Sequence, residues 1–353
     1  MLPGVPPPGD LTRPQASELV RSTLQWMRYL SERLLLVPTA KHLPPVAAIG
    51  LGRLLAAVDL VLPTAASRVA RAEMEAASGV RGLRLWVLAW HRRAAPRVDL
   101  VWLARMAAGR ESLADWKVIE RNGARAHAVL DDGGPVLLVT GHFSTAAFHV
   151  LQKALPRPAA FVRGDVSTGP ASPGERRRRM FDGLRDSARE RLLGERYPDA
   201  RLTIRVADAW GPGGNWGDAA GRANAVKEML AVARSPGGLL AVRIDAIWGA
   251  PGAHERPFAG MASRPFADGS IGVAALARAT VISFVAVLGR RNRTVLVEWG
   301  EPAAPPRHRS EEERKVLDGA IDFIECAVAR HGAAYQAPFG SERRWDAENA
   351  RWR

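Results

Sequence analysis

VLLVTGHFSTAAFHV, residues 136–150, is the stretch that decides the fold. Its first five residues are apolar or β-branched, which predicts a buried strand. Gly141 and His142 end this strand, and the apolar run that follows Ser144 and Thr145 predicts a helix. A strand that passes directly into a helix is the unit from which parallel α/β sheets are built.

The same alternation continues along the chain and predicts an α/β fold. We expect a central mixed or mostly parallel sheet that is covered by helices. Further apolar runs predict strands at 159–163, 239–245, 280–288 and 294–300, and we expect helices at about 113–131, 144–154, 174–193, 219–234, 270–278 and 310–330. Residues 194–218 are interpreted as a loop insertion with one possible extra strand.

The pattern of the N-terminal third differs from that of the rest of the chain. We therefore expect three parts: a disordered N-terminus (1–14), a helical membrane-proximal region (15–110) and an α/β domain (111–353). Within 15–110 we expect helices at 15–36, 46–61 and 64–77, and a pair within 82–108 that is broken near Ala95 and Pro96. The apolar stretch 43–63 carries Arg53 and Asp59, which favour a helix in the membrane interface over a spanning one.

Charge and cysteine content limit the classes of function. The chain has 50 Lys and Arg against 36 Asp and Glu, a net charge of +14, which favours an anionic membrane surface, nucleic acid or phosphorylated substrates as partners. A compositional bias toward Arg is the alternative. The basic helix 174–192 is either a solvated face or a contact for lipid headgroups, an acidic carrier protein or RNA. The single cysteine, Cys326, excludes a disulfide framework within the chain and favours a reducing compartment. The first residues lack the pattern of a signal peptide.

Three polar residues are expected at the ends of strands. His142, Arg163 and Asp245 each follow an apolar run, so parallel strands would bring them to one edge of the sheet, where α/β folds bind ligands. Ser144 is expected to cap the following helix, whose N–H groups could stabilise an oxyanion. His149, two helical turns beyond His142, is expected to pack in the core.

These residues carry a resemblance to the bacterial lipid A biosynthesis acyltransferases, a lauroyl/myristoyl transferase family in the lysophospholipid acyltransferase superfamily. The similar stretches cover roughly 40–345 in order: VLLVTGHFSTAAF (136–148), AAFVRGD (159–165), GGLLAVRIDAIWG (237–249), the segment 255–287, VEWGEPA (297–303) and APFGSERRW (337–345).

The resemblance implies a membrane-surface acyltransferase. A fatty acyl group would pass from acyl-carrier protein or acyl-CoA to a hydroxyl or amine of a lipid or glycolipid, at the cytoplasmic face of the inner membrane. No cofactor, no metal and no nucleic-acid partner are implied. In the family's H-x₄-D/E motif the histidine is the general base, which here is His142, and Arg163 and Asp245 match its strand-end arginine and aspartate. Arg163, Ser144 and Asp165 are candidates for substrate binding.

The motif departs from the family at its acid, because Ala147 stands at that position. Another carboxylate, Asp245 or Asp165, could orient His142; the enzyme could act more slowly or on a more acidic acceptor; or the protein could be an impaired homologue that binds lipid or acyl carrier. A nucleic-acid-binding protein is a weaker alternative. We expect a carboxylate within about 3 Å of the His142 ring.

Overall fold

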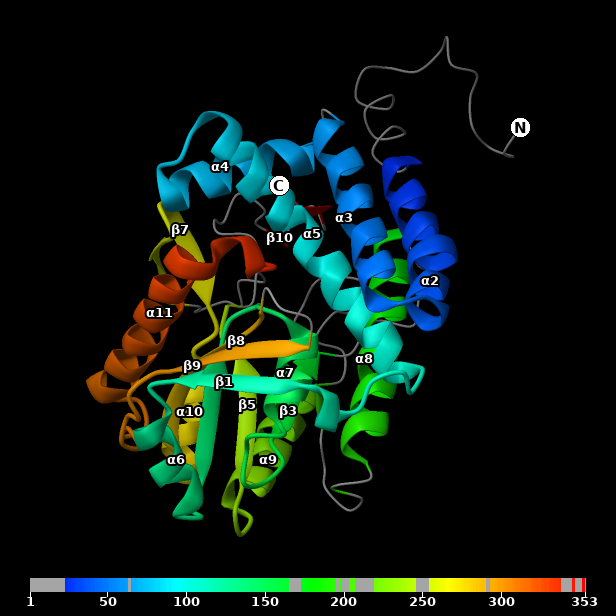
Figure 1. The fold of residues 1–353 in the computed structure, drawn as a ribbon. Helices are drawn as coiled ribbons and strands as arrows, with labels where there is room; N and C mark the ends of the chain where they lie inside the picture. Colours follow the sequence, from blue (N-terminus) through cyan, green and yellow to red (C-terminus); the bar gives the residue numbers. More distant parts are fainter. Residues whose placement is uncertain are drawn as a thin grey trace.

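A seven-stranded sheet forms the centre of the protein (Figure 1). The computed structural model describes residues 23–62, 65–164, 173–194, 197, 203–206, 219–245, 254–289, 293–337, 345–346 and 351–352. Across the sheet the strands are β1 (Lys117–Arg121), β9 (Thr294–Trp299), β8 (Thr280–Leu288), β2 (Val136–Thr140), β5 (Leu239–Arg243), β3 (Ala160–Gly164) and β4 (Thr203–Val206). All neighbouring pairs are parallel except β8–β9, so the predicted α/β class with a mostly parallel sheet is confirmed.

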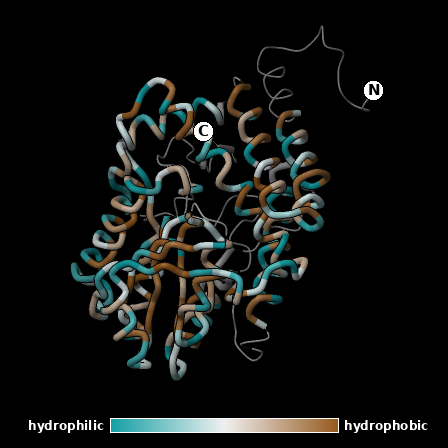
Figure 2. Tube along the Cα trace, viewed as in Figure 1, coloured by the Kyte–Doolittle hydropathy of each residue, from teal (hydrophilic) through white to brown (hydrophobic). Residues whose placement is uncertain are grey.

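Helices cover both faces of the sheet, and β2 shows why. Its five residues are all buried, with Val136 and Leu138 in one apolar cluster and Leu137 and Val139 in another. Successive side chains of a strand point to opposite faces, so an uninterrupted apolar run needs a cover on each side. Figure 2 shows this hydrophobic centre. One cluster includes α5 (Gly82–Ala107), α6 (Gly123–Asp131), α7 (Thr145–Leu151) and α8 (Pro173–Leu193); the other includes α9 (Ala219–Arg234), α10 (Gly269–Ala277) and α11 (Glu311–His331).

The N-terminal region is helical, as expected. It runs through residues 23–31, η1 (Glu32–Leu36), α2 (Val37–His42), α3 (Pro45–Val61) and α4 (Ala65–Ser78) into α5. Figure 1 shows α2, α3, α5 and α8 side by side at one flank of the sheet. Within the described ranges, no helix has both the length and the apolar character that crossing a membrane requires.

Two predictions about helices are wrong. The segment 82–108 is one helix rather than a pair, and it continues through Pro96. A proline removes one helical hydrogen bond, but residues on both sides of Pro96 are buried and packing on α3 and α8 keeps the helix continuous. The segment 113–131 is a short 3₁₀ helix, η2 (Leu113–Asp115), then β1 and α6. β1 lies at the edge of the sheet, and most of its residues are exposed. Its sequence, KVIER, therefore lacks the continuous apolar run that predicts a buried strand.

Smaller elements complete the fold. The expected extra strand within 194–218 is β4, and the hairpin β6 (His254–Phe258) and β7 (Met261–Phe266) was not predicted. The remaining elements are η3 (Gly332–Ala334), β10 (Trp345–Asp346) and β11 (Arg351–Trp352). The N-terminus 1–14, predicted to be disordered, lies outside the described residues.

Candidate active site

His142 lies where β2 ends and the turn into α7 begins. The preceding residue, Gly141, is closely surrounded, because a Cβ added there would come within 3.0 Å of the Tyr335 ring and 3.1 Å of Asp245 Oδ2. Glycine therefore lets the backbone pass close to these side chains, and the passage brings His142 beside Asp245. The His142 side chain is 32% exposed, so it remains accessible.

Asp245 is the carboxylate that orients His142. Its Oδ1 lies 2.6 Å from His142 Nδ1, and its Oδ2 accepts the His142 backbone N–H at 2.7 Å. Asp245 follows β5, the parallel neighbour of β2, so the two residues meet at the carboxyl edge of the sheet. The expected carboxylate within about 3 Å of the ring is therefore confirmed, and it is Asp245.

Two further residues hold the carboxylate in place, and both are distant in sequence. The Tyr335 hydroxyl donates to Asp245 Oδ2. Arg264 on β7 donates from Nη2 to the Asp245 backbone oxygen at 2.8 Å, and the same nitrogen lies 3.8 Å from Oδ2. Asp245 is fully buried and Arg264 is 1% exposed. A buried carboxylate with this many donors is fixed in position.

The charges favour a neutral imidazole next to an ionised carboxylate. Burial alone would raise the pKa of Asp245, but His142, Arg264 and the Tyr335 hydroxyl hold it well below its usual range. Burial lowers the pKa of His142 from 6.5, Asp245 raises it, and Arg243 and Arg264 lower it further. Because an ionised carboxylate only accepts, Nδ1 carries the ring proton and Nε2 keeps its lone pair. His142 is therefore set up as a proton acceptor at neutral pH.

The N-terminus of α7 is filled by a protein carboxylate. Asp99 on α5, fully buried, accepts from Ser144 Oγ at 2.5 Å and from the N–H groups of Thr145 and Ala146 at 3.0 and 2.9 Å. Ser144 Oγ in turn accepts the Ala147 N–H, so Ser144 is the predicted helix cap. Since these N–H groups already have partners, they do not form the oxyanion site that the sequence suggested. The role of Ser144 in substrate binding stays a prediction.

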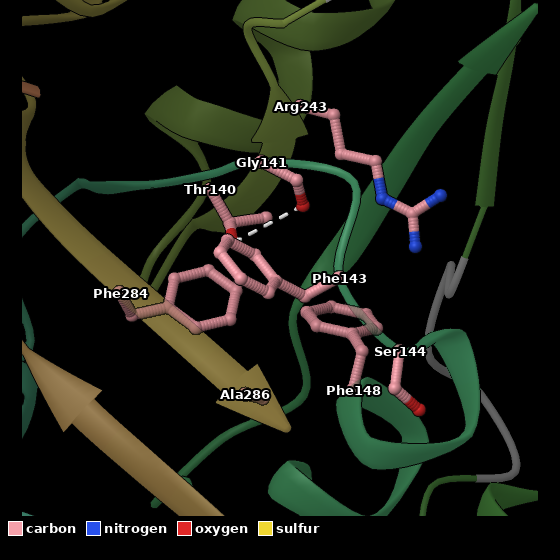
Figure 3. A pocket seen from close by; sticks show the side chains of 8 residues that line it. All are labelled: Thr140, Gly141, Phe143, Ser144, Phe148, Arg243, Phe284 and Ala286. Carbon is pink, nitrogen blue, oxygen red and sulfur yellow. Dashed lines mark hydrogen bonds between the residues drawn. The ribbon is translucent and has the colours of Figure 1, made fainter. Parts of the chain in front are cut away.

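A small hollow lies at the end of β2, where Gly141 and Phe143, the chain neighbours of His142, form part of its lining (Figure 3). It offers room for about one water molecule, far less than a typical small-molecule site. Arg243, at the end of β5, is the charged residue in its lining. Its Nη2 donates to Thr145 Oγ1 at 2.9 Å, and its guanidinium lies 5.2 Å from the Phe161 ring centre. The lining residues are Thr140, Gly141, Phe143, Ser144, Phe148, Arg243, Phe284 and Ala286.

Two comparisons with known proteins were negative. Neither the family models nor the curated proteins gave a match to the chain. The acyltransferase resemblance therefore stays a prediction that rests on the quoted motifs and on the geometry of the site.

The other sequence-predicted residues fall into different places. Arg163 belongs to β3, which is parallel to β5, so it lies at the same sheet edge as His142 and Asp245; its side chain is not described. Asp165 lies outside the described residues. Ala147, at the family's acid position, is fully buried on α7. His149 is 1% exposed, and its pKa is well below 6.5 because of burial and the nearby Arg189 and Arg185, so it is a neutral core residue as expected.

Sequence reasoning missed the residues that support the site. Asp99, Arg264 and Tyr335 are spread over the chain, and no local spacing links them to His142. The basic helix 174–192 is also more buried than a solvated face, since Arg185 and Arg189 are 7% and 5% exposed. Among the residues that the structure describes, no group of three or more His, Cys, Asp or Glu side chains is arranged to hold a metal ion.

Proposed function

We propose that the protein is an acyltransferase in which His142 is the general base and Asp245 is the residue that orients it. The contact between His142 Nδ1 and Asp245 Oδ1, at 2.6 Å, carries this proposal. A histidine held by an ionised carboxylate is the arrangement that activates a hydroxyl for attack on an acyl group. Asp245 would also take the place of the acid that the family has at the position of Ala147. The missing acid was the main reason to regard the protein as an impaired homologue.

In the proposed reaction, the His142 imidazole first accepts a proton and then gives it back. His142 Nε2 takes the proton of an acceptor hydroxyl or amine while the acceptor oxygen or nitrogen attacks the carbonyl carbon of a thioester. The carbonyl oxygen becomes an oxyanion, which the Arg243 guanidinium beside the hollow can stabilise. The carbon–sulfur bond then breaks, and the departing sulfur takes the proton from His142. The products are the acylated acceptor and a free thiol.

The proposed substrates are a thioester donor, either acyl-CoA or acyl-carrier protein, and a lipid or glycolipid acceptor at a membrane surface. Thirteen of the fifteen large hydrophobic side chains that are exposed in the described ranges lie on the N-terminal helices, between Trp26 and Val87. An exposed apolar surface of this extent is typical of a contact with lipid or with another protein. The net charge of +14 favours an anionic leaflet. The proposed location is therefore the cytoplasmic face of the inner membrane, as a peripheral protein.

Transfer of a labelled acyl group tests the proposed function. The full chain is incubated with labelled acyl-CoA or acyl-carrier protein and with a membrane lipid extract, beside His142→Ala and a control, His308→Ala, in which a histidine away from Asp245 is changed. We expect transfer by the wild type and by the control, and a loss of about 10³-fold or more in His142→Ala. Transfer that survives His142→Ala would exclude this residue as the base. Lipid or carrier binding without transfer from either donor would favour the impaired homologue.

A further inference from the structure

A cluster of four arginines lies between the N-terminal helices and α8. It consists of Arg28, Arg93, Arg97 and Arg177, and we refer to it as the arginine cluster. These residues come from the helical stretch 23–31, from α5 and from α8, and α3 contributes one of the acids between them. The elements α3, α5 and α8 run side by side in Figure 1.

Two carboxylates, Glu32 and Asp59, are shared among the four arginines. Glu32 accepts from Arg177 Nε at 2.5 Å and lies 3.3 Å from Arg97 Nε. Asp59 Oδ2 accepts from Arg97 Nη2 at 2.7 Å and from Arg93 Nη2 at 2.9 Å. Arg28 Nε reaches both acids, at 3.4 and 3.8 Å. With four cations and two anions, the arginine cluster and its two acids carry a net charge of +2.

This excess charge is largely removed from water. Arg97 is 1% exposed, and its Nη1 has no hydrogen-bond partner within the described part of the chain; the same is true of the buried Nε of Arg93. A buried guanidinium nitrogen without an acceptor is costly. Burial, and then the neighbouring Arg177, lower the pKa of Arg28 well below its usual value, which agrees with the crowding of like charges. An additional anion would accept hydrogen bonds from these nitrogens and would reduce the repulsion among the arginines.

Part of the arginine cluster is open to solvent. The side chains of Arg93, Arg28 and Arg177 are 16%, 22% and 27% exposed, whereas Arg97 is buried. The planar guanidinium group matches the oxygens of a phosphate and binds them in pairs. Exposed apolar residues stand next to the cluster in sequence: Trp26, Met27 and Leu30 around Arg28, and Val58 and Val61 around Asp59.

We propose that the arginine cluster is a binding site for a phosphate group, of the kind that the headgroup of an anionic phospholipid carries. A bound phosphate contributes the one or two negative charges that Glu32 and Asp59 leave unmatched, and it offers acceptors to Arg97 and Arg93. The exposed apolar residues of the same helices would then meet the acyl region of the bilayer. This inference does not depend on the proposed chemistry at His142.

Binding of inorganic phosphate to the full chain tests the site directly. Thermal unfolding and calorimetry are measured with phosphate and with chloride at equal ionic strength. The variants are Arg93→Gln and Arg177→Gln, and the control is Arg53→Gln, an exposed arginine of α3 outside the cluster. We expect saturable stabilisation by phosphate, unchanged in the control and weakened at least about tenfold in each cluster variant. Stabilisation equal to that of chloride, or equal in variants and wild type, would show that the cluster is only an ion-pair network.

Vesicles distinguish the two sources of the phosphate. Binding of the wild type to phosphatidylglycerol vesicles is compared with that of Arg93→Gln. If the variant binds more weakly, and if inorganic phosphate displaces the wild type from the vesicles, the ligand is a lipid headgroup. Saturable phosphate binding that leaves the vesicle affinity unchanged would identify a free phosphate ion. Neither result requires acyl transfer, so this proposal can fail or hold independently of the acyltransferase proposal.

Discussion

At the scale of single residues, the proposed site depends on a carboxylate that follows a different strand from the one that leads to His142. The resemblance puts the acid five residues after the histidine, on the helix. In this chain that position is Ala147, and Asp245 approaches His142 from β5 instead. The imidazole still gains a partner for Nδ1, which the proposed role as a base requires. The position of an orienting acid in the sequence is therefore less constrained than its position in space.

Asp245→Asn keeps the shape of this side chain and removes its charge. We expect acyl transfer to slow by about 10³–10⁴-fold, because the imidazolium that forms during the reaction loses its counter-charge. The pKa of His142 should fall further, since Asp245 raises it in the wild type. Transfer rates and an NMR titration of the His142 ring measure the two effects. Tyr335→Phe, which removes one hydrogen bond and leaves the charge, should cause a smaller loss; equal activity of Asp245→Asn and wild type would contradict the assigned role.

Gly141→Ala tests the close packing behind His142. The added methyl group would meet Tyr335, Asp245 and Ile324 at 3.0–3.1 Å, so we expect a loss of about 1–3 kcal/mol in the free energy of unfolding, together with lower activity. Denaturant unfolding measures the change. Gly319→Ala is the control, because its Cβ meets nothing within 4 Å on α11 and should stabilise the helix by up to about 1 kcal/mol. If Gly141→Ala leaves the free energy of unfolding unchanged, the site can rearrange around the added methyl group.

At the scale of elements, α5 connects the N-terminal helices to the turn that carries His142. Its Asp99 accepts the first N–H groups of α7, which leaves the start of that helix without free donors. Burial raises the pKa of Asp99, while its hydrogen bonds to Ser144 and to the Ala146 and Thr145 backbone lower it. The carboxylate thus fixes α7, and with it the turn that carries His142, to α5.

Asp99→Ala should therefore destabilise the protein more than the loss of an ordinary cap. Two buried N–H groups and the Ser144 hydroxyl would lose their acceptor, so we expect a loss of about 2–4 kcal/mol in the free energy of unfolding. Chemical denaturation provides the measurement. Asp268→Ala is the matched control, since Asp268 precedes α10 without a side-chain cap and is exposed. A loss no larger than that of Asp268→Ala would show that Asp99 does not hold the turn.

At the scale of the whole molecule, charge and apolar surface are unevenly distributed. The N-terminal helices carry exposed large hydrophobic side chains on the outside and the arginine cluster with its two acids on the inside. The α/β domain has few such side chains exposed among its described residues, namely Ile119 and Leu276. The predictions on membrane binding and on acid stability therefore concern the N-terminal part.

Replacement of exposed apolar residues should weaken membrane binding. We expect Leu34→Glu combined with Val61→Glu to reduce binding to anionic vesicles by at least about tenfold, because two side chains that are 62% and 77% exposed lose their apolar contribution and gain negative charge. Co-sedimentation with vesicles measures the binding. Leu276→Glu, at an exposed apolar site on α10, should leave it unchanged. If all three proteins bind equally, the N-terminal helices do not meet the bilayer.

Stability should fall in acid through Glu32. Although burial raises its pKa, Arg177, Arg28 and Arg97 lower it from 4.5 to about 2. The folded pKa lies below the unfolded one, so Glu32 stabilises the protein above about pH 4.5 and this contribution is lost as pH falls toward 2. It is on the order of 3 kcal/mol. Unfolding measured from pH 6 to pH 2 should show a smaller decrease for Glu32→Gln, while Glu301→Gln, an exposed partner of Arg125, should match the wild type. A decrease as steep in Glu32→Gln as in the wild type would assign the acid sensitivity to other carboxylates.

The sequence by itself determined the class of fold and the edge at which the site lies. Uninterrupted apolar runs such as 136–140 and 280–288 require burial on both faces, and the polar residues that end parallel strands must gather at one edge. His142 and Asp245 could therefore be placed together in advance. β1 could not, because its residues are mostly exposed and its partner β9 lies far along the chain. The β6–β7 hairpin could not either, because Pro257 and Pro265 interrupt the pattern that predicts a strand.

Only the tertiary structure decided what surrounds His142. Tyr335, Arg264 and Asp99 lie between 43 and 193 residues from His142 in the chain, and hydrogen bonds over such separations leave no local pattern. The continuous α5 is a second example, since packing overrides the proline within it. Local sequence predicts where chain segments are buried, whereas the partners of a buried polar group depend on which segments the fold brings together.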